Sequence, residues 1–149
     1  MNILLIEDSD FKRSRVQNFL KEELEEKITI EVACSYTSGL NSLIDNDYDL
    51  AIIDMSLPNY DRVPGIPDGE FRTYGGLDLA RQIKRRKIKT KFIFLTQFDA
   101  FSEKGKNVDL RIIEDETKEK HPEQFLGCIY YEHAGYNWKD NLMNVVKSL

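Results

Sequence analysis

Short runs of aliphatic and aromatic residues alternate along the chain with longer segments in which apolar residues recur every three or four positions. The short runs predict strands buried in a sheet, since strands covered on both faces are almost wholly apolar. We place the strands at residues 2–6, 28–33, 50–53, 92–96 and 127–131. Strands that alternate with helices predict an α/β protein with a parallel sheet and helices on both faces.

The helical segments have recognisable starts. Ser9 or Asp10 can cap the first helix, and Thr37 or Ser38 can cap the second, because short polar side chains satisfy the first free backbone N–H groups. The third helix follows Gly75 and Gly76, and the last begins near Asn137. Apolar positions at helical spacing, such as Val16, Phe19, Leu20 and Leu24 in the first helix, predict the buried faces.

Two connections are too long for plain turns, and we expect insertions after the third and fourth strands. Loops beyond ~12–15 residues are usually functional or disordered. Residues 57–76 are rich in Pro and Gly and predict an irregular lid. Residues 97–124 predict an aromatic, irregular start and a solvated helix within 109–120, with an extra strand at 108–113 as the alternative.

The bulk properties narrow the class of protein. A chain of 149 residues fits one domain, here residues 1–149, with one hydrophobic core. The net charge of -5 argues against nucleic-acid binding, and the basic run at residues 84–91 complements the end of a helix dipole. No apolar run reaches the ~20 residues that span a bilayer. We expect a cytoplasmic protein that binds neither nucleic acid nor membranes.

Polar side chains follow three of the predicted strands. Asp54 comes directly after residues 50–53, Glu7 and Asp8 follow the first strand, and Thr96 ends the fourth. Parallel strand ends meet at one edge of a sheet, where ligands bind in open α/β folds. Clustered carboxylates with a hydroxyl nearby are suited to a hydrated Mg²⁺ and a phosphoryl group.

The order of elements and three motifs resemble the receiver domain of two-component response regulators over nearly the whole chain. The motifs are ILLIEDSD at residues 3–10, LAIIDMSLP at 50–58 and FIFLT at 92–96. The resemblance implies a flavodoxin-like, doubly wound five-stranded sheet in the order 2-1-3-4-5. It also implies Mg²⁺-dependent phosphorylation of an aspartate by a partner histidine kinase, a phosphotransfer protein or a small phosphodonor.

Roles follow from the resemblance residue by residue. Asp54 matches the phosphoacceptor, Glu7 and Asp8 match the acidic pair that organises Mg²⁺, the carbonyl of Ser56 matches a third metal oxygen, and Thr96 matches the switch hydroxyl. The chemistry is reasonable, because a carboxylate can attack phosphorus to give an acyl phosphate. A dication must then separate its charge from the phosphoryl oxygens.

The fifth strand departs from the family pattern, which normally has a lysine at its end. Tyr131 falls at that position and Glu132 follows it. Lys139 lies within the next helix and is a poor substitute, whereas His133 or Arg72 are candidates to supply the missing cation. We therefore expect a weak conformational switch.

Two other functions stay open. The chain can be a receiver-like interaction module that does not switch by phosphorylation, an alternative favoured by the missing lysine and by the long segment after Asp54. It can also be a metal-dependent phosphate-processing enzyme, although Ser56 occupies the place where such an enzyme would carry a second acid. A receiver that stands alone must act through surface contact with another protein, which the sequence does not identify.

Overall fold

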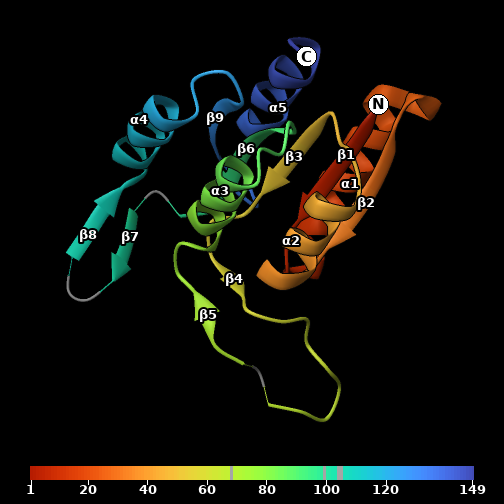
Figure 1. Ribbon diagram of the computed structural model, residues 1–149. Coiled ribbons are helices and arrows are strands. Elements are labelled where there is room, and N and C mark those ends of the chain that lie inside the picture. The colour runs from red at the N-terminus through yellow and green to blue at the C-terminus, as the bar shows by residue number, and fades with distance from the viewer. Residues whose placement is uncertain (68, 99, 104–105) are drawn as a thin grey trace.

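A five-stranded parallel sheet in the order β2-β1-β3-β6-β9 forms the centre of the computed structural model, which describes residues 1–67, 69–98, 100–103 and 106–149 (Figure 1). The strands are β1 (Asn2–Ile6), β2 (Thr29–Ala33), β3 (Leu50–Ile53), β6 (Lys91–Thr96) and β9 (Phe125–Tyr130). The helices are α1 (Asp10–Leu24), α2 (Tyr36–Asp45), α3 (Gly75–Arg85), α4 (Leu110–Lys120) and α5 (Asn137–Lys147), with a short 3-10 turn at Glu25–Lys27. This strand order and the helices on both faces confirm the predicted flavodoxin-like fold.

Two separate hydrophobic layers hold the helices to the sheet, because successive residues of a strand point to opposite faces. In β1, Leu4 and Ile6 pack with α2, α3 and α4, whereas Ile3 and Leu5 pack with α1 and α5. Trp138 of α5 belongs to the second layer. None of the described helices has the length and apolar character needed to cross a bilayer.

Helix starts are set by local side chains. Ser9 caps α1 by accepting from the Lys12 N–H, as one of the two predicted caps. The predicted cap of α2 is wrong: α2 starts earlier, and Ser35 is the cap, accepting from the Ser38 N–H. The side chain of Ser38 completes a capping box with the Ser35 N–H. Ser35, Thr37 and Ser38 are all suitable caps, and the tertiary fold determines which of them caps α2.

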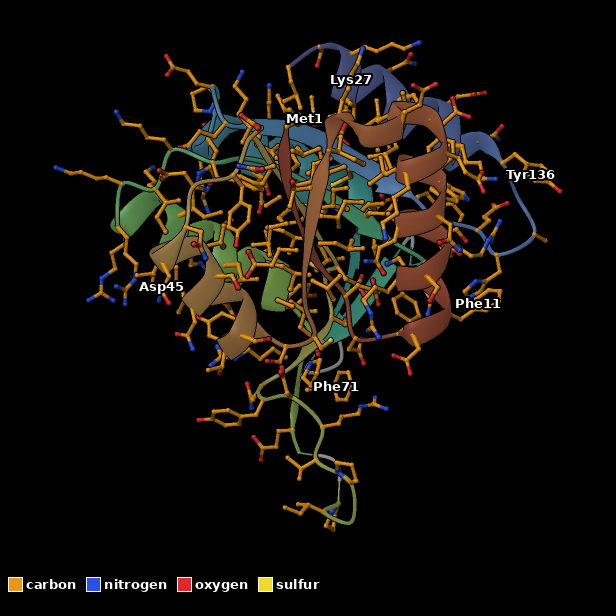
Figure 2. All side chains as sticks on the ribbon, turned by 90° about the vertical axis from the view of Figure 1, so that its right-hand side faces the viewer. Met1, Phe11, Lys27, Asp45, Phe71 and Tyr136 are labelled. Atoms are coloured by element: carbon orange, nitrogen blue, oxygen red, sulfur yellow. The ribbon has the colours of Figure 1, made fainter. Side chains whose placement is uncertain are left out.

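Both insertions contain short hairpins that the sequence analysis did not place. β4 (Leu57–Pro58) pairs with β5 (Phe71–Arg72), and the chain between them extends away from the body beyond the carboxyl ends of the central strands (Figures 1 and 2). β7 (Ala100–Glu103) pairs with β8 (Lys106–Asp109) and leads into α4. The predicted helix is present as α4, but it is not fully solvated, since Ile113 and Thr117 are buried.

The last strand, β9, starts two residues before its predicted position and contains a bulge. Gly127 has φ +125, a backbone conformation that favours glycine, and the pairing register with β6 shifts beside it. The N–H of Cys128 donates to Glu114 Oε2 at 2.7 Å. A side chain of α4 thus provides the hydrogen-bond partner for this backbone group beside the bulge. Tyr130 then pairs with Thr96, and Tyr131 follows directly after the strand.

Candidate functional site

Three carboxylates meet at the carboxyl ends of β1 and β3. Ile6 pairs with Ile53, so that Glu7 and Asp54 leave neighbouring strands at the same height. One carboxylate oxygen from each of Glu7, Asp8 and Asp54 lies within 4.8 Å of the other two. The structure thus brings together the three acids that the sequence analysis placed at one edge of the sheet. Glu7 and Asp54 are buried, whereas Asp8 is half-buried.

A cavity of about 400 Å³ opens over these acids. It is lined by Glu7, Asp8, Ser9, Asp54, Ser56, Phe71, Thr73, Gln97 and Phe98. Phe71 and Thr73 come from the segment after β3, so this segment does lie beside the pocket; its gating role stays a prediction. A larger groove of about 850 Å³, between α3, α4 and the β4–β5 pair, contains none of the three acids, and we assign no chemistry to it.

Ser56 and Thr96, which the sequence analysis also assigned to the site, both form hydrogen bonds through their hydroxyl groups. Ser56 lines the cavity and donates its hydroxyl to the Thr73 carbonyl at 3.0 Å. Thr96 is fully buried, and its Oγ1 accepts from the Phe98 N–H at 3.2 Å. Of the described residues that line the cavity, Gln97 and Phe98 directly follow β6, and Thr96 is not among the lining residues.

A lysine that the sequence analysis overlooked lies at the centre of the site. Lys12 of α1 is 2 % exposed, and its Nζ donates to the Leu95 carbonyl at 2.6 Å. The same Nζ lies 2.7 Å from Glu7 Oε2 and 3.4 Å from Asp54 Oδ1. The sequence analysis named Arg72 and His133 as candidates for a replacement cation and did not consider this lysine, which α1 supplies to the site.

The spacing along α1 contained the signal for Lys12. Lys12, Val16 and Leu20 lie four residues apart and share one face of the helix, and Val16 and Leu20 are fully buried against the sheet. A charged residue that continues a buried apolar stripe must find a partner. Lysine usually lies at the polar face of a helix, and the sequence analysis therefore passed over it.

The candidates for a replacement cation have other partners. Arg72 donates to Asn59 Oδ1 at 2.6 Å, pairs with Asp78 at 3.2 Å and lies 3.8 Å over the Tyr36 ring. His133 lies after β9, with its ring 5.1 Å from that of Phe11. Neither is among the described residues that line the cavity.

Tyr131 is fully buried below the lysine. Its ring centroid lies 5.5 Å from Lys12 Nζ and 5.1 Å from the ring of Trp138. Its hydroxyl accepts from Arg15 Nη1 at 3.0 Å, and the same nitrogen donates to the His133 carbonyl at 2.6 Å. Lys12 and Arg15 of α1 therefore contact the ring and the hydroxyl of one tyrosine.

Burial and crowding change the proton affinities of the acids. Burial raises the pKa of Glu7 to about 7, and the Asp54 carboxylate adds to this rise against the attraction of Lys12. Burial also raises the pKa of Asp54 and that of Asp8. At Asp8 the charge of Glu7 adds to the rise, and Arg62, which lies 3.2 Å from Asp8 Oδ2, opposes it.

The pKa of Lys12 moves in the direction that keeps its charge. Burial alone would lower this pKa, but the attraction of Asp54 and Glu7 together raises it above the ordinary value. Lys12 therefore remains an ammonium ion throughout the physiological pH range. A cation that is buried and paired in this way is retained when the carboxylates around it change partners.

The donor set fits a hard divalent cation. Three clustered carboxylates face one buried ammonium, so the pocket carries an excess of negative charge when all three are ionised. Burial is the largest cause of the raised pKa values of Glu7 and Asp8, and the charge of a neighbouring carboxylate adds to each rise. Oxygen ligands in such a cluster suit Mg²⁺, which keeps several waters and needs few protein ligands.

This fold and this acidic pocket define a class of signalling domain. Residues 3–127 match the model of the response regulator receiver domain family. The chain belongs to this family. The match includes the acids at β1 and β3 and Thr96, and it ends at Gly127, before Tyr131 and α5.

Two relatives extend over nearly the full chain. The uncharacterised protein y4jR of Sinorhizobium fredii is 28% identical over 152 residues, which cover 100% of this chain and 99% of y4jR. The Detocs response regulatory protein DtcB of Enterobacter cloacae is 28% identical over 148 residues, which cover 98% of this chain and 99% of DtcB.

Solved receiver structures share the fold. A CheY-like receiver domain protein from Methanospirillum hungatei superposes with a TM-score of 0.62 at 17% identity, over 99% of this chain and 91% of that chain. The response regulator TrrA of Thermotoga maritima, in complex with Mg²⁺ and BeF, gives a TM-score of 0.58 at 23% identity, over 99% and 98%.

Proposed function

We propose that this chain is the phosphoacceptor domain of a two-component phosphorelay, phosphorylated on Asp54 in a Mg²⁺-dependent reaction. The observation that carries the proposal is the cluster of Glu7, Asp8 and Asp54, with oxygens within 4.8 Å of one another beside a buried lysine. A carboxylate in such a pocket is a competent nucleophile toward phosphorus.

The other groups around Asp54 also have roles in this proposal. Glu7, Asp8, Asp54 and the Ser56 carbonyl would hold Mg²⁺, which when bound offsets the negative charge shared by Asp54 and the phosphoryl oxygens. Thr96 Oγ1 accepts from the Phe98 N–H, so its own hydrogen can be donated to a phosphoryl oxygen. The cavity over Asp54 gives a donor access to the carboxylate.

The phosphoryl group would come from a histidine kinase or a phosphotransfer protein, and the output would be contact with another protein. Membership of the receiver family supports this source. DtcB carries the name of a response regulatory protein, and TrrA shows that the fold accommodates Mg²⁺ together with BeF. Both observations favour signalling over the alternative of a phosphate-processing enzyme.

Intact mass spectrometry tests the proposal. With acetyl phosphate and Mg²⁺, the parent chain should gain one phosphoryl group, and Asp54→Asn should gain none, since an amide is not a nucleophile toward phosphorus. The exposed Asp45 at the end of α2 provides the control, and Asp45→Asn should label as the parent does. A parent that binds Mg²⁺ yet never takes a phosphoryl group from any donor would favour the interaction module.

A further inference from the structure

The buried ammonium of Lys12 has one weak interaction among its three. Its Nζ carries three hydrogens and faces three acceptors, of which the Leu95 carbonyl at 2.6 Å and Glu7 Oε2 at 2.7 Å are close. Asp54 Oδ1, at 3.4 Å, is the distant one, and it also accepts from the Met55 N–H at 2.8 Å. The first two contacts fix the ammonium in place, and the third can be exchanged at low cost.

We propose that Lys12 is the residue that binds the phosphoryl group on Asp54, so that α1 supplies the phosphoryl-binding cation of this chain. The inference rests on the proposed function. In the transfer, an Asp54 oxygen forms the new bond to phosphorus while the bond from phosphorus to the donor atom breaks, which is a nitrogen in a phosphohistidine and the bridging oxygen in acetyl phosphate. The leaving group departs with that electron pair. Lys12 stays protonated and exchanges its long contact with Asp54 for a phosphoryl oxygen.

The charges favour this exchange. Phosphorylation converts the Asp54 carboxylate into an acyl phosphate, whose phosphoryl group carries a charge of about -1.5 to -2. The negative charge that Lys12 faces becomes larger and moves outward from β3 into the cavity. The ammonium remains attached to Leu95 and Glu7, so it meets the new charge without leaving the site. A hydrogen bond between two charged partners is roughly twice as strong as one between neutral groups.

Lys12 also connects the phosphoryl group to a particular surface. Arg15, one turn further along α1, donates to Tyr131 and to the His133 carbonyl, and Phe11 packs its ring on His133. The attraction between the fixed Lys12 ammonium and the phosphoryl group therefore acts on the first turns of α1, which contact the chain after β9. We infer that the surface that responds consists of the start of α1 and residues 131–136. Phe11 lies at the edge of the molecule in Figure 2 and is 61 % exposed.

Binding of beryllofluoride, a mimic of the phosphoryl group, tests the proposal in the presence of Mg²⁺. Titration calorimetry should show that Lys12→Gln still binds Mg²⁺ but loses about tenfold or more in affinity for beryllofluoride, the scale of one charged hydrogen bond. Lys21→Gln, on the exposed side of the same helix, should bind both as the parent does. Moving the charge to the neighbouring strand end, in Lys12→Gln/Tyr131→Lys, should restore part of the loss.

A measurement on the parent covers the case in which Lys12→Gln does not fold. In NMR, the fluorine atoms of bound beryllofluoride should show NOEs to the ammonium hydrogens of a lysine. A parent without such NOEs, or a folded Lys12→Gln with parental affinity, overturns the role of Lys12 and leaves the proposed function standing. A parent that takes up neither beryllofluoride nor a phosphoryl group overturns both.

Discussion

Glu7 shows how one residue can set the pH response of the whole site. Its pKa of about 7 lies well above the ordinary 4.5, because it is buried next to Asp54. Between these two values the folded chain holds a proton that the unfolded chain has released. Stability then falls as pH rises through this window, since the unfolded state binds fewer protons.

We therefore predict that the metal-free chain is less stable at pH 7.5 than at pH 5, by on the order of 2 kcal/mol from Glu7. Urea unfolding in the presence of EDTA measures the effect. Glu7→Gln cannot ionise, and its stability should vary less over the same range. Parallel curves for parent and variant would mean that the Glu7 pKa is not raised. Saturating Mg²⁺ should remove most of the loss in the parent.

At the scale of elements, the contact between α3 and β3 leaves no room for a side chain at Gly76. A Cβ there would lie 2.9 Å from the Asp54 carbonyl and 3.2 Å from Met55 Cα, both of them backbone atoms. The Gly76 N–H also donates to the Met55 carbonyl at 2.8 Å. The glycine thus lets the start of α3 contact the strand end that carries Asp54.

Gly76→Ala should lower the free energy of unfolding by about 1–2 kcal/mol, because overpacking against the backbone outweighs the better helix propensity of alanine. Gly69→Ala is the matched control, since a Cβ at Gly69 meets no atom within 4 Å. Chemical denaturation of both variants decides the matter. Equal stability of the two would show that α3 can shift away from β3.

The sequence predicts the strands whose apolar pattern matches their buried place in the sheet. β1 and β3 have the predicted bounds. Each is a short apolar run next to polar residues, and such a run is typical of a strand buried in a parallel sheet. The β4–β5 and β7–β8 hairpins have strands of two and four residues, too short for a periodic pattern. Their pairing depends on chain contacts that no local signal specifies.

The residues of the candidate site could likewise be predicted only in part. Glu7, Asp8 and Asp54 could be predicted, since Glu7 and Asp54 directly follow apolar runs and Asp8 is the next residue after Glu7. The spacing along α1 indicated that Lys12 continues a buried stripe, but its partners could not be predicted, because a lysine in a helix usually extends into solvent. Its burial depends on the position of α1 above the strand ends, which only the packed structure provides.

At the scale of the whole molecule, the segment between β4 and β5 joins the site to α2. Thr37 Oγ1 donates to the Asn59 carbonyl at 2.6 Å, and Ser38 Oγ donates to Asp61 Oδ1 at 2.8 Å. Arg62 reaches across to Asp8. The base of the segment is thus fixed on α2, while the part beyond extends away from the body (Figure 2).

We predict that shortening this segment between Asn59 and Glu70 to a tight turn speeds phosphorylation of Asp54 by acetyl phosphate, because it opens the cavity to the donor. Rates from intact mass spectrometry measure the change. Arg62→Gln is the control, because it removes the charge near Asp8 but keeps the segment over the cavity. An unchanged rate in the shortened chain would rule out gating by this segment.

The contact between Tyr131 and Trp138 has a practical consequence. Trp138 is the single tryptophan of the chain, and its ring lies 5.1 Å from Tyr131, whose ring lies 5.5 Å from the Lys12 ammonium. The emission of an indole depends on the charges and dipoles around it. Ultraviolet excitation of the unlabelled chain therefore provides an optical signal that depends on the site through one contact between rings and one contact between a ring and a cation.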